Sequence, residues 1–190
     1  ITPPTNPNIA GYTDSTQTTA LVDGERGNTL TPYFVSTVND SDLQGYYVYF
    51  GTDASADPEV SGAFQTSGTY QATVSGGDDV SYYLRAKAKD NAGNISTGTA
   101  QFEYRVDTVA SPATNVGNTN QFGGTSIFWT NNDPNLSHNI IARSTSHFGF
   151  YNHVNTASGT TYVDNTPQPG ETWYYVVAAV DDLGNIATYS

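Results

Sequence analysis

The sequence has no cysteine among its 190 residues and few basic ones. Without cysteine, neither disulfide bonds nor thiolate metal sites can hold the fold, so its stability must come from packing. Six Lys and Arg stand against 18 Asp and Glu, which gives a net charge of −12. This charge repels the phosphate backbone of nucleic acids and anionic membrane surfaces, so neither is expected as a partner.

Long apolar runs are also absent. No run approaches the roughly 18 apolar residues of a membrane span, and the N-terminus shows no basic segment followed by an apolar one. We therefore expect no membrane insertion. Thr, Ser, Asn and Gly are abundant and Tyr is the main aromatic residue, which favours strands and turns. This composition is typical of an exported bacterial or archaeal surface protein, and we expect an extracellular location.

One segment of the chain occurs twice. SYYLRAKAKDNAGNIS at residues 81–96 returns without a gap as TWYYVVAAVDDLGNIA at residues 172–187, with Gly93 and Gly184 in matched places. The duplication predicts two domains, at residues 1–108 and 109–190. Because the linker at residues 107–112 is short, we expect the two domains to lie end to end.

Apolar and polar residues alternate with a period of two, and no stretch keeps a helical period. The sequence thus predicts an all-β protein with seven short strands in each domain, typical of two β-sandwiches. Strands are expected in the first domain at residues 8–14, 30–38, 45–52, 63–66, 69–74, 80–89 and 99–106. In the second they are expected at residues 113–116, 125–130, 139–144, 148–154, 161–164, 172–180 and 186–189.

The second domain carries a family pattern: Trp129 in a strand, IIARST at 140–145, TYVD at 161–164, and PGETWYYVVAAVD at 169–181 followed by LGN. It resembles the fibronectin type III modules of bacterial surface proteins and secreted polysaccharide-degrading enzymes. The first domain is similar over residues 45–53 and 82–95, but it is longer and has Tyr33 and Phe34 in place of the tryptophan. The resemblance implies tandem seven-stranded sandwiches that act as non-catalytic modules.

The repeated strand of the second domain is apolar on both faces. Trp173, Tyr175, Val177 and Ala179 should face the core, yet the alternate positions are also apolar: Tyr174, Val176, Ala178 and Val180. Such a sheet needs a cover. We expect it from the chain's own connection containing Phe148, Phe150 and Tyr151; the alternative is a neighbouring module or subunit that contacts Tyr174 and Val176.

No set of residues converges on a catalytic pattern. The histidines, His138, His147 and His153, have no metal-binding spacing, and no Gly-x-Ser-x-Gly motif occurs. We therefore expect no enzymatic activity and no required cofactor.

Calcium is the one ion worth considering. In a fibronectin-like sandwich, two loops of the second domain would share the end where its first strand enters, near the linker. This arrangement would gather hard oxygen ligands from Asp107, Asp133, Asp181 and Asp182. The alternative is that these are ordinary turn residues, since turns attract Asp.

Tyrosines of the first domain suggest a second surface. Tyr47, Tyr49 and Tyr83, beside Arg85, should share the exposed side of two strands and could form a flat platform for a glycan or a protein. Tyrosine also simply favours strands, so a structural role is the alternative.

The last strand of the second domain is expected to be cut short. The first domain continues for 13 residues from Ile95 to Asp107, whereas the second stops five residues after Asn185. We expect either a longer parent chain or a neighbouring subunit to complete the strand. The favoured function is a spacer or stalk segment of a surface-layer, adhesin or filament protein, with neighbouring modules as partners. The alternative is a glycan- or protein-binding accessory module of a secreted polysaccharide-degrading enzyme.

Overall fold

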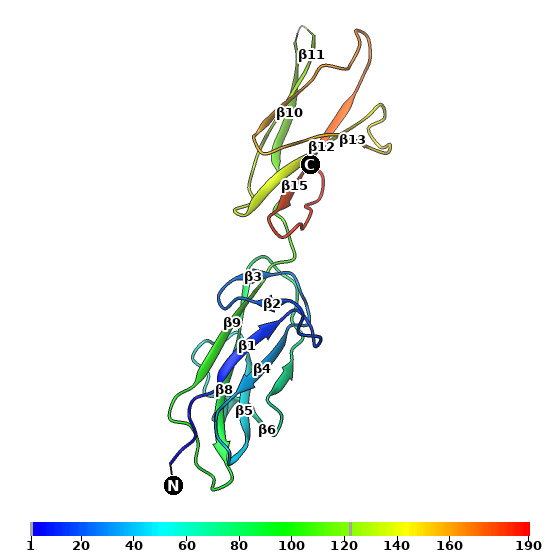
Figure 1. Ribbon diagram of the computed structural model, residues 1–190. Helices are drawn as coiled ribbons and strands as arrows, with labels where there is room; N and C mark the ends of the chain where they lie inside the picture. Colours follow the sequence, from blue (N-terminus) through cyan, green and yellow to red (C-terminus); the bar gives the residue numbers. More distant parts are fainter. Residues whose placement is uncertain (1, 122) are drawn as a thin grey trace. The chain divides into compact units, whose positions relative to one another are not determined.

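The computed structural model describes residues 2–121 and 123–190. Its backbone divides into two compact units, one that ends at Thr108 and one that begins at Val109 (Figure 1). In both, strands are the main regular secondary structure, which confirms the all-β prediction, and the described residues contain a single helix, α1 (Pro58–Ser61). Nothing helical in that part of the chain is long and apolar enough to cross a membrane.

The first unit contains two sheets. One has the strand order β2-β1-β4-β7. The other has the order β3-β9-β8-β5-β6, in which only the short β3–β9 pair is parallel. The strands of the first sheet are β1 (Asn8–Tyr12), β2 (Ala20–Leu21), β4 (Tyr33–Thr37) and β7 (Thr69–Gln71). Those of the second are β3 (Arg26–Gly27), β5 (Leu43–Gly51), β6 (Ala63–Gln65), β8 (Val80–Asp90) and β9 (Ala100–Val106).

All seven strands predicted for this unit are present, and three shorter elements were missed. β2 and β3 have two residues each, too few to show an alternating pattern. The one-turn helix α1 is set by local chemistry: Pro58 opens it, and the Asp57 carboxylate accepts the N–H of Glu59 at 3.1 Å.

The core of the first unit lies between its two sheets. Leu84, Ala86 and Ala88 are fully buried, and the residues between them on β8 are only partly so, as the alternation predicts. Phe34 of β4 meets Phe102 of β9 edge to face, with ring centroids 5.5 Å apart.

Tyr104 of β9 is also buried, and its hydroxyl donates a hydrogen bond to the Thr29 carbonyl at 2.8 Å. Burial raises the pKa of Tyr104 from 10.0 to about 12. The unfolded chain therefore loses this proton at a lower pH than the folded one, so stability falls as the pH rises from 10 towards 12.

We predict that Tyr104→Phe weakens this alkaline loss of stability in the first unit. At neutral pH the variant should lose about 1 kcal/mol, because the hydrogen bond to the Thr29 carbonyl is lost. Urea denaturation at a series of pH values measures both effects. The wild-type chain is the reference, and an unchanged alkaline slope in Tyr104→Phe would contradict the assignment.

The second unit contains two three-stranded sheets, in the orders β10-β11-β14 and β13-β12-β15. Its core is formed by Ile127, Trp129, Ile141 and Val177, with Tyr175 partly buried against them. The inward face predicted for the repeated strand is thus confirmed at Tyr175 and Val177. The strands are β10 (Thr114–Gln121), β11 (Gly124–Thr130), β12 (Leu136–Ser144), β13 (Asn152–Ala157), β14 (Thr161–Asp164) and β15 (Tyr174–Asp181).

Two strand predictions for this unit were wrong. Residues 186–189, expected as the last strand, form only an isolated bridge between Val180 and Ile186. The other wrong prediction also removes the predicted cover of β15. The strand expected at residues 148–154 starts only at Asn152, because the preceding residues form a turn closed by the Gly149 N–H on the Ser146 carbonyl. Phe148 and Phe150 are 94% and 97% exposed, so they cover nothing. Ala178 and Val180 are nevertheless buried on the outer face, whereas Tyr174 is 37% exposed.

The repeated segment ends in the same turn in both units. Gly93 and Gly184 have φ values of 92° and 84°, in the left-handed region that favours glycine. The preceding aspartates close the turn: Asp90 accepts the Asn94 main-chain N–H at 2.7 Å, and Asp181 accepts that of Asn185 at 2.8 Å. The side-chain amide of Asn94 is the main cause that lowers the pKa of Asp90.

We predict that Gly184→Ala destabilises the second unit by about 1 kcal/mol, because a Cβ disfavours the left-handed conformation. Gly159→Ala is the matched control. An added Cβ meets no atom within 4 Å at either position, and only Gly184 has a positive φ. Urea denaturation should separate the two variants, and equal effects would show that φ is not the cause.

Candidate functional site

The four aspartates of the calcium hypothesis already have protein partners. Asp107 of the first unit forms an ion pair with Arg26 at 3.0 Å. Asp133 accepts the N–H groups of Ser111 and Asn135 at 2.6 and 2.8 Å.

In the second unit the structure brings three of the four aspartates into adjoining turns. Asp182 donates its main-chain N–H to the Asn135 carbonyl at 3.0 Å, which links it to the turn of Asp133. The neighbouring Asp181 accepts the Leu183 N–H at 3.0 Å. Over the described residues, no group of three or more His, Asp or Glu is placed to hold a metal. Calcium stays a hypothesis, which a comparison of melting temperatures in chelator and in millimolar calcium tests.

The predicted tyrosine platform lies on the outer face of the five-stranded sheet of the first unit. Tyr49 of β5 sits directly opposite Arg85 of β8, with Tyr83 and Tyr47 at neighbouring positions. All four side chains are partly buried. Sequence alternation alone therefore placed these residues on one face.

Each side chain of the platform is engaged by the chain itself. Tyr47 meets Phe64 at 5.3 Å between ring centroids, and the Tyr83 hydroxyl donates to Glu103 at 3.3 Å. Arg85 donates to the carbonyl of Ala54 in the β5–β6 connection. The same connection contains α1 and is tied to the sheet by the Lys87–Asp57 ion pair at 2.8 Å. These contacts fix the tyrosines in place.

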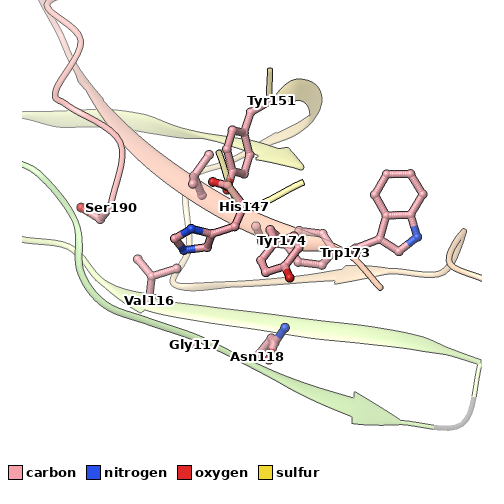
Figure 2. Close-up of a pocket in the computed structure, with 10 residues that line it drawn as sticks. Val116, Gly117, Asn118, His147, Tyr151, Trp173, Tyr174 and Ser190 are labelled. Carbon is pink, nitrogen blue, oxygen red and sulfur yellow. The ribbon is translucent and has the colours of Figure 1, made fainter. Parts of the chain in front are cut away.

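A groove with a volume of 340 Å³ lies between β10 and β15 of the second unit (Figure 2). Tyr174 and Val176, which the sequence suggested as a partner surface, are part of its wall. Figure 2 shows the Tyr174 side chain directed towards Asn118 on β10, and Ser190 at the other end of the groove. The remaining lining residues are Val116, Gly117, His147, Tyr151, Trp173 and Tyr175.

The sequence did not point to the β10 side of the groove. The strand TNVGNTNQ is polar and lacks alternation, so only its start was predicted. His147 reaches the groove from the turn after β12, and its ring meets Tyr174 edge to face at 5.3 Å. Residues from distant parts of the sequence line the groove together, so no local pattern could signal it.

A buried ion pair lies next to the groove. Arg143 of β12 pairs with Asp164 of β14, whose side chain is fully buried. The Tyr175 hydroxyl donates to the same carboxylate at 3.0 Å, and Trp173 stacks on the Arg143 guanidinium at 4.1 Å. Burial raises the pKa of Asp164, but hydrogen bonds from Thr166 and Tyr175 and the charge of Arg143 outweigh it and leave the pKa below its ordinary value.

We predict that Arg143→Met destabilises the second unit by about 3 kcal/mol, because it leaves the Asp164 carboxylate buried without its cation. Urea denaturation followed by two-dimensional NMR resolves the two units. Asp57→Asn is the control: it removes an ion pair whose carboxylate side chain is 46% exposed, and the unfolding midpoint should hardly move. A midpoint shift in Arg143→Met no larger than in the control would contradict the prediction.

The strand order is the same in both units when β2 and β3 are set aside. The first, second and fifth strands form one sheet, and the third, fourth and sixth form the other. The seventh position beside the sixth strand is taken by β9 in the first unit and by residues 186–190 in the second. The chain therefore consists of two fibronectin type III-like sandwiches, as the sequence resemblance implied.

The comparison with solved structures found similar proteins, whereas the comparisons of sequence found none. No family model matches the chain, and no curated protein matches it. Among solved structures, it is similar to a Fn3-like protein from Clostridium thermocellum, with 27% identity and a TM-score of 0.40 over 43% of this chain and 86% of that one.

Two longer structures are also similar. The FN1–FN3 domains of chicken CNTN1 share 13% identity at a TM-score of 0.43, over 90% of this chain and 62% of that one. Titin domains A168–A170 share 12% identity at a TM-score of 0.49, over 97% of this chain and 86% of that one.

Proposed function

We propose that this chain is a non-catalytic spacer: two tandem modules of an extracellular surface-layer, adhesin or filament protein. The observation that carries the proposal is the duplication. Each unit has its own core and repeats the same strand order and the same Asp–Gly–Asn turn. Two copies of one separately packed unit add length and stability to a protein. They do not build the single asymmetric site that catalysis needs, so a spacer role suits them.

The composition supports the extracellular part of the proposal. A net charge of −12 disfavours association with nucleic acid, and a fold packed without cysteine does not depend on the redox state of its surroundings. Neighbouring modules of the same parent protein are the partners that a spacer implies.

A spacer must hold its two modules apart in solution, so we predict an extended particle. A compact 190-residue domain would have a radius of gyration of about 16 Å. Small-angle X-ray scattering of the chain should give a value well above that. A radius near the compact value would show that the modules fold back on each other, and it would remove the spacer function.

The alternative is a binding module, such as an accessory module of a secreted polysaccharide-degrading enzyme. It is favoured by the shared face of Tyr47, Tyr49, Tyr83 and Arg85, where aromatic side chains could stack on sugar rings. Titration with soluble xylan and cellohexaose, followed by the NMR signals of β5 and β8, tests this alternative. Tyr49→Ala should abolish any response, and the absence of a response in the wild type removes the alternative.

A further inference from the structure

Residues 13–32 of the first unit form an insert that has no counterpart in the second. In the first unit β1 ends at Tyr12 and β4 begins at Tyr33, whereas in the second β10 ends at Gln121 and β11 begins at Gly124. The insert contains β2, which pairs with β1, and β3, which pairs with β9 of the other sheet. It therefore bridges the two sheets along one edge of the sandwich.

Two neighbouring residues of the insert, Asp23 and Gly24, pair with a single residue of β9. The Glu103 N–H donates to the Asp23 carboxylate at 2.6 Å, and the Glu103 carbonyl accepts the Gly24 N–H at 3.1 Å. Gly24 has a φ of 79°, and the Glu25 N–H closes the turn on the Val22 carbonyl at 3.1 Å. The side chain of Asp23 thus takes the place of a main-chain carbonyl in the pairing with β9.

Further contacts fasten the insert along the end of β9. The Asp107 N–H donates to the Gly27 carbonyl at 2.9 Å, and the buried Asp107 carboxylate pairs with Arg26 at 3.0 Å. The Tyr104 hydroxyl donates to the Thr29 carbonyl at 2.8 Å. The insert lies on the edge of β9 that faces away from β8, so its attachment decides whether the main chain of that edge is paired or exposed.

The turn of the insert contains the only Asp–Gly sequence of the chain, and no Asn–Gly sequence occurs. Glycine has no side chain to keep its nitrogen away from the preceding carboxyl group. Attack of the Gly24 nitrogen on Cγ of Asp23 forms a C–N bond, and the amide proton leaves with the carboxyl hydroxyl as water, which gives a succinimide. Water then adds to the main-chain carbonyl carbon of Asp23 and breaks its bond to the Gly24 nitrogen. The product is isoaspartate, an isomer that requires no other reagent.

The folded structure holds both reacting groups apart. The Gly24 N–H and the Asp23 carboxylate are each bonded to Glu103, so the nitrogen and the carboxyl carbon cannot meet while both hydrogen bonds persist. The reaction therefore requires the insert to detach first, and its rate is proportional to the fraction of molecules in which the insert is detached. In isoaspartate the main chain runs through Cβ and the acceptor of the Glu103 N–H becomes a shorter carboxylate. The two bonds to Glu103 can then no longer form together.

We propose that Asp23–Gly24 is a modification site, where isomerisation to isoaspartate releases the insert irreversibly and exposes the edge of β9. The main chain of Glu103 restrains the reaction, and the ion pair of Arg26 and Asp107 sets how often the insert detaches. The exposed edge presents N–H and C=O groups to which another strand can add. This inference does not depend on where the parent protein is located.

Incubation of the whole chain at neutral pH tests the proposal, with peptide mapping that separates aspartate from isoaspartate. The chain in urea, where the contacts of the insert are lost, should convert at the full chemical rate. The folded wild type should convert at least about tenfold more slowly, because the insert is detached in only a small fraction of the molecules. In the converted chain the amides of Glu103 and Asp107 should lose their protection from hydrogen exchange.

Two variants that weaken the attachment of the insert should raise the rate in the folded chain. Arg26→Met removes the buried ion pair and should raise conversion of Asp23 about tenfold or more. Tyr104→Phe removes one hydrogen bond to the insert and should raise it about fivefold, so it serves as the second variant if Arg26→Met does not fold. Arg143→Met is the matched control: it removes a comparably buried ion pair from the second unit and should leave the rate at Asp23 unchanged.

Val48→Ala separates detachment of the insert from unfolding of the whole unit. Val48 lies in the core on β5, which is not a neighbour of β3 or β9 in the sheet. The variant should lower the unfolding midpoint of the first unit and leave the conversion rate unchanged.

Four results would overturn the proposal. The first is an absence of isoaspartate at this position in the chain unfolded by urea, and the second is an equal rate in the folded and the unfolded chain. The third is a rate in both attachment variants no higher than in Arg143→Met. The fourth is an increase in Val48→Ala as large as that in Arg26→Met, which would show that unfolding of the whole unit controls the reaction.

Discussion

The repeated strand, β8 in the first unit and β15 in the second, is the constraint on which each sandwich depends. It bonds to a neighbour on each edge, buries one face in the core and ends in the Asp–Gly–Asn turn. The turn fixes where the next strand starts, because the carboxylate of Asp90 or Asp181 accepts the N–H groups that follow it. The described pairing that follows the turn differs in extent: β9 pairs with β8 past Leu84, and residues 187–190 pair with β15 as far as Val177.

The sequence predicted best where local pattern and tertiary packing agree. Strands β5 and β8 show a clear alternation of apolar and polar residues, and β15 repeats the sequence of β8. Gly93 and Gly184 occupy the same place in both copies, and both have a positive φ. Prediction failed at Phe148 and Phe150, where aromatic residues indicated a strand but Gly149 lies in a turn. Most of strand β10 was not predicted, because its edge position leaves most of its side chains exposed and polar. The alternation of apolar and polar residues that indicates a strand is therefore absent there.

The candidate surfaces differ in what a sequence can reveal about them. Alternation placed Tyr47, Tyr49, Tyr83 and Arg85 on one face, but it could not show that the β5–β6 connection engages Arg85. A groove formed by two strands that are 50 residues or more apart depends on register and on an unpaired edge, which only the folded chain displays. For the same reason the ion pair of Arg143 and Asp164 was not foreseen, because its two residues lie 21 positions apart in the sequence.

The two tryptophans give the molecule a built-in spectroscopic asymmetry. Both lie in the second unit: Trp129 is buried in the core, and Trp173 stacks on the Arg143 guanidinium. The first unit has tyrosine as its only strong fluorophore. Excitation at the red edge of the indole band therefore reports on the second unit alone, with Trp129 in its core and Trp173 at the wall of the groove. A single unlabelled sample thus distinguishes loss of one module from loss of both.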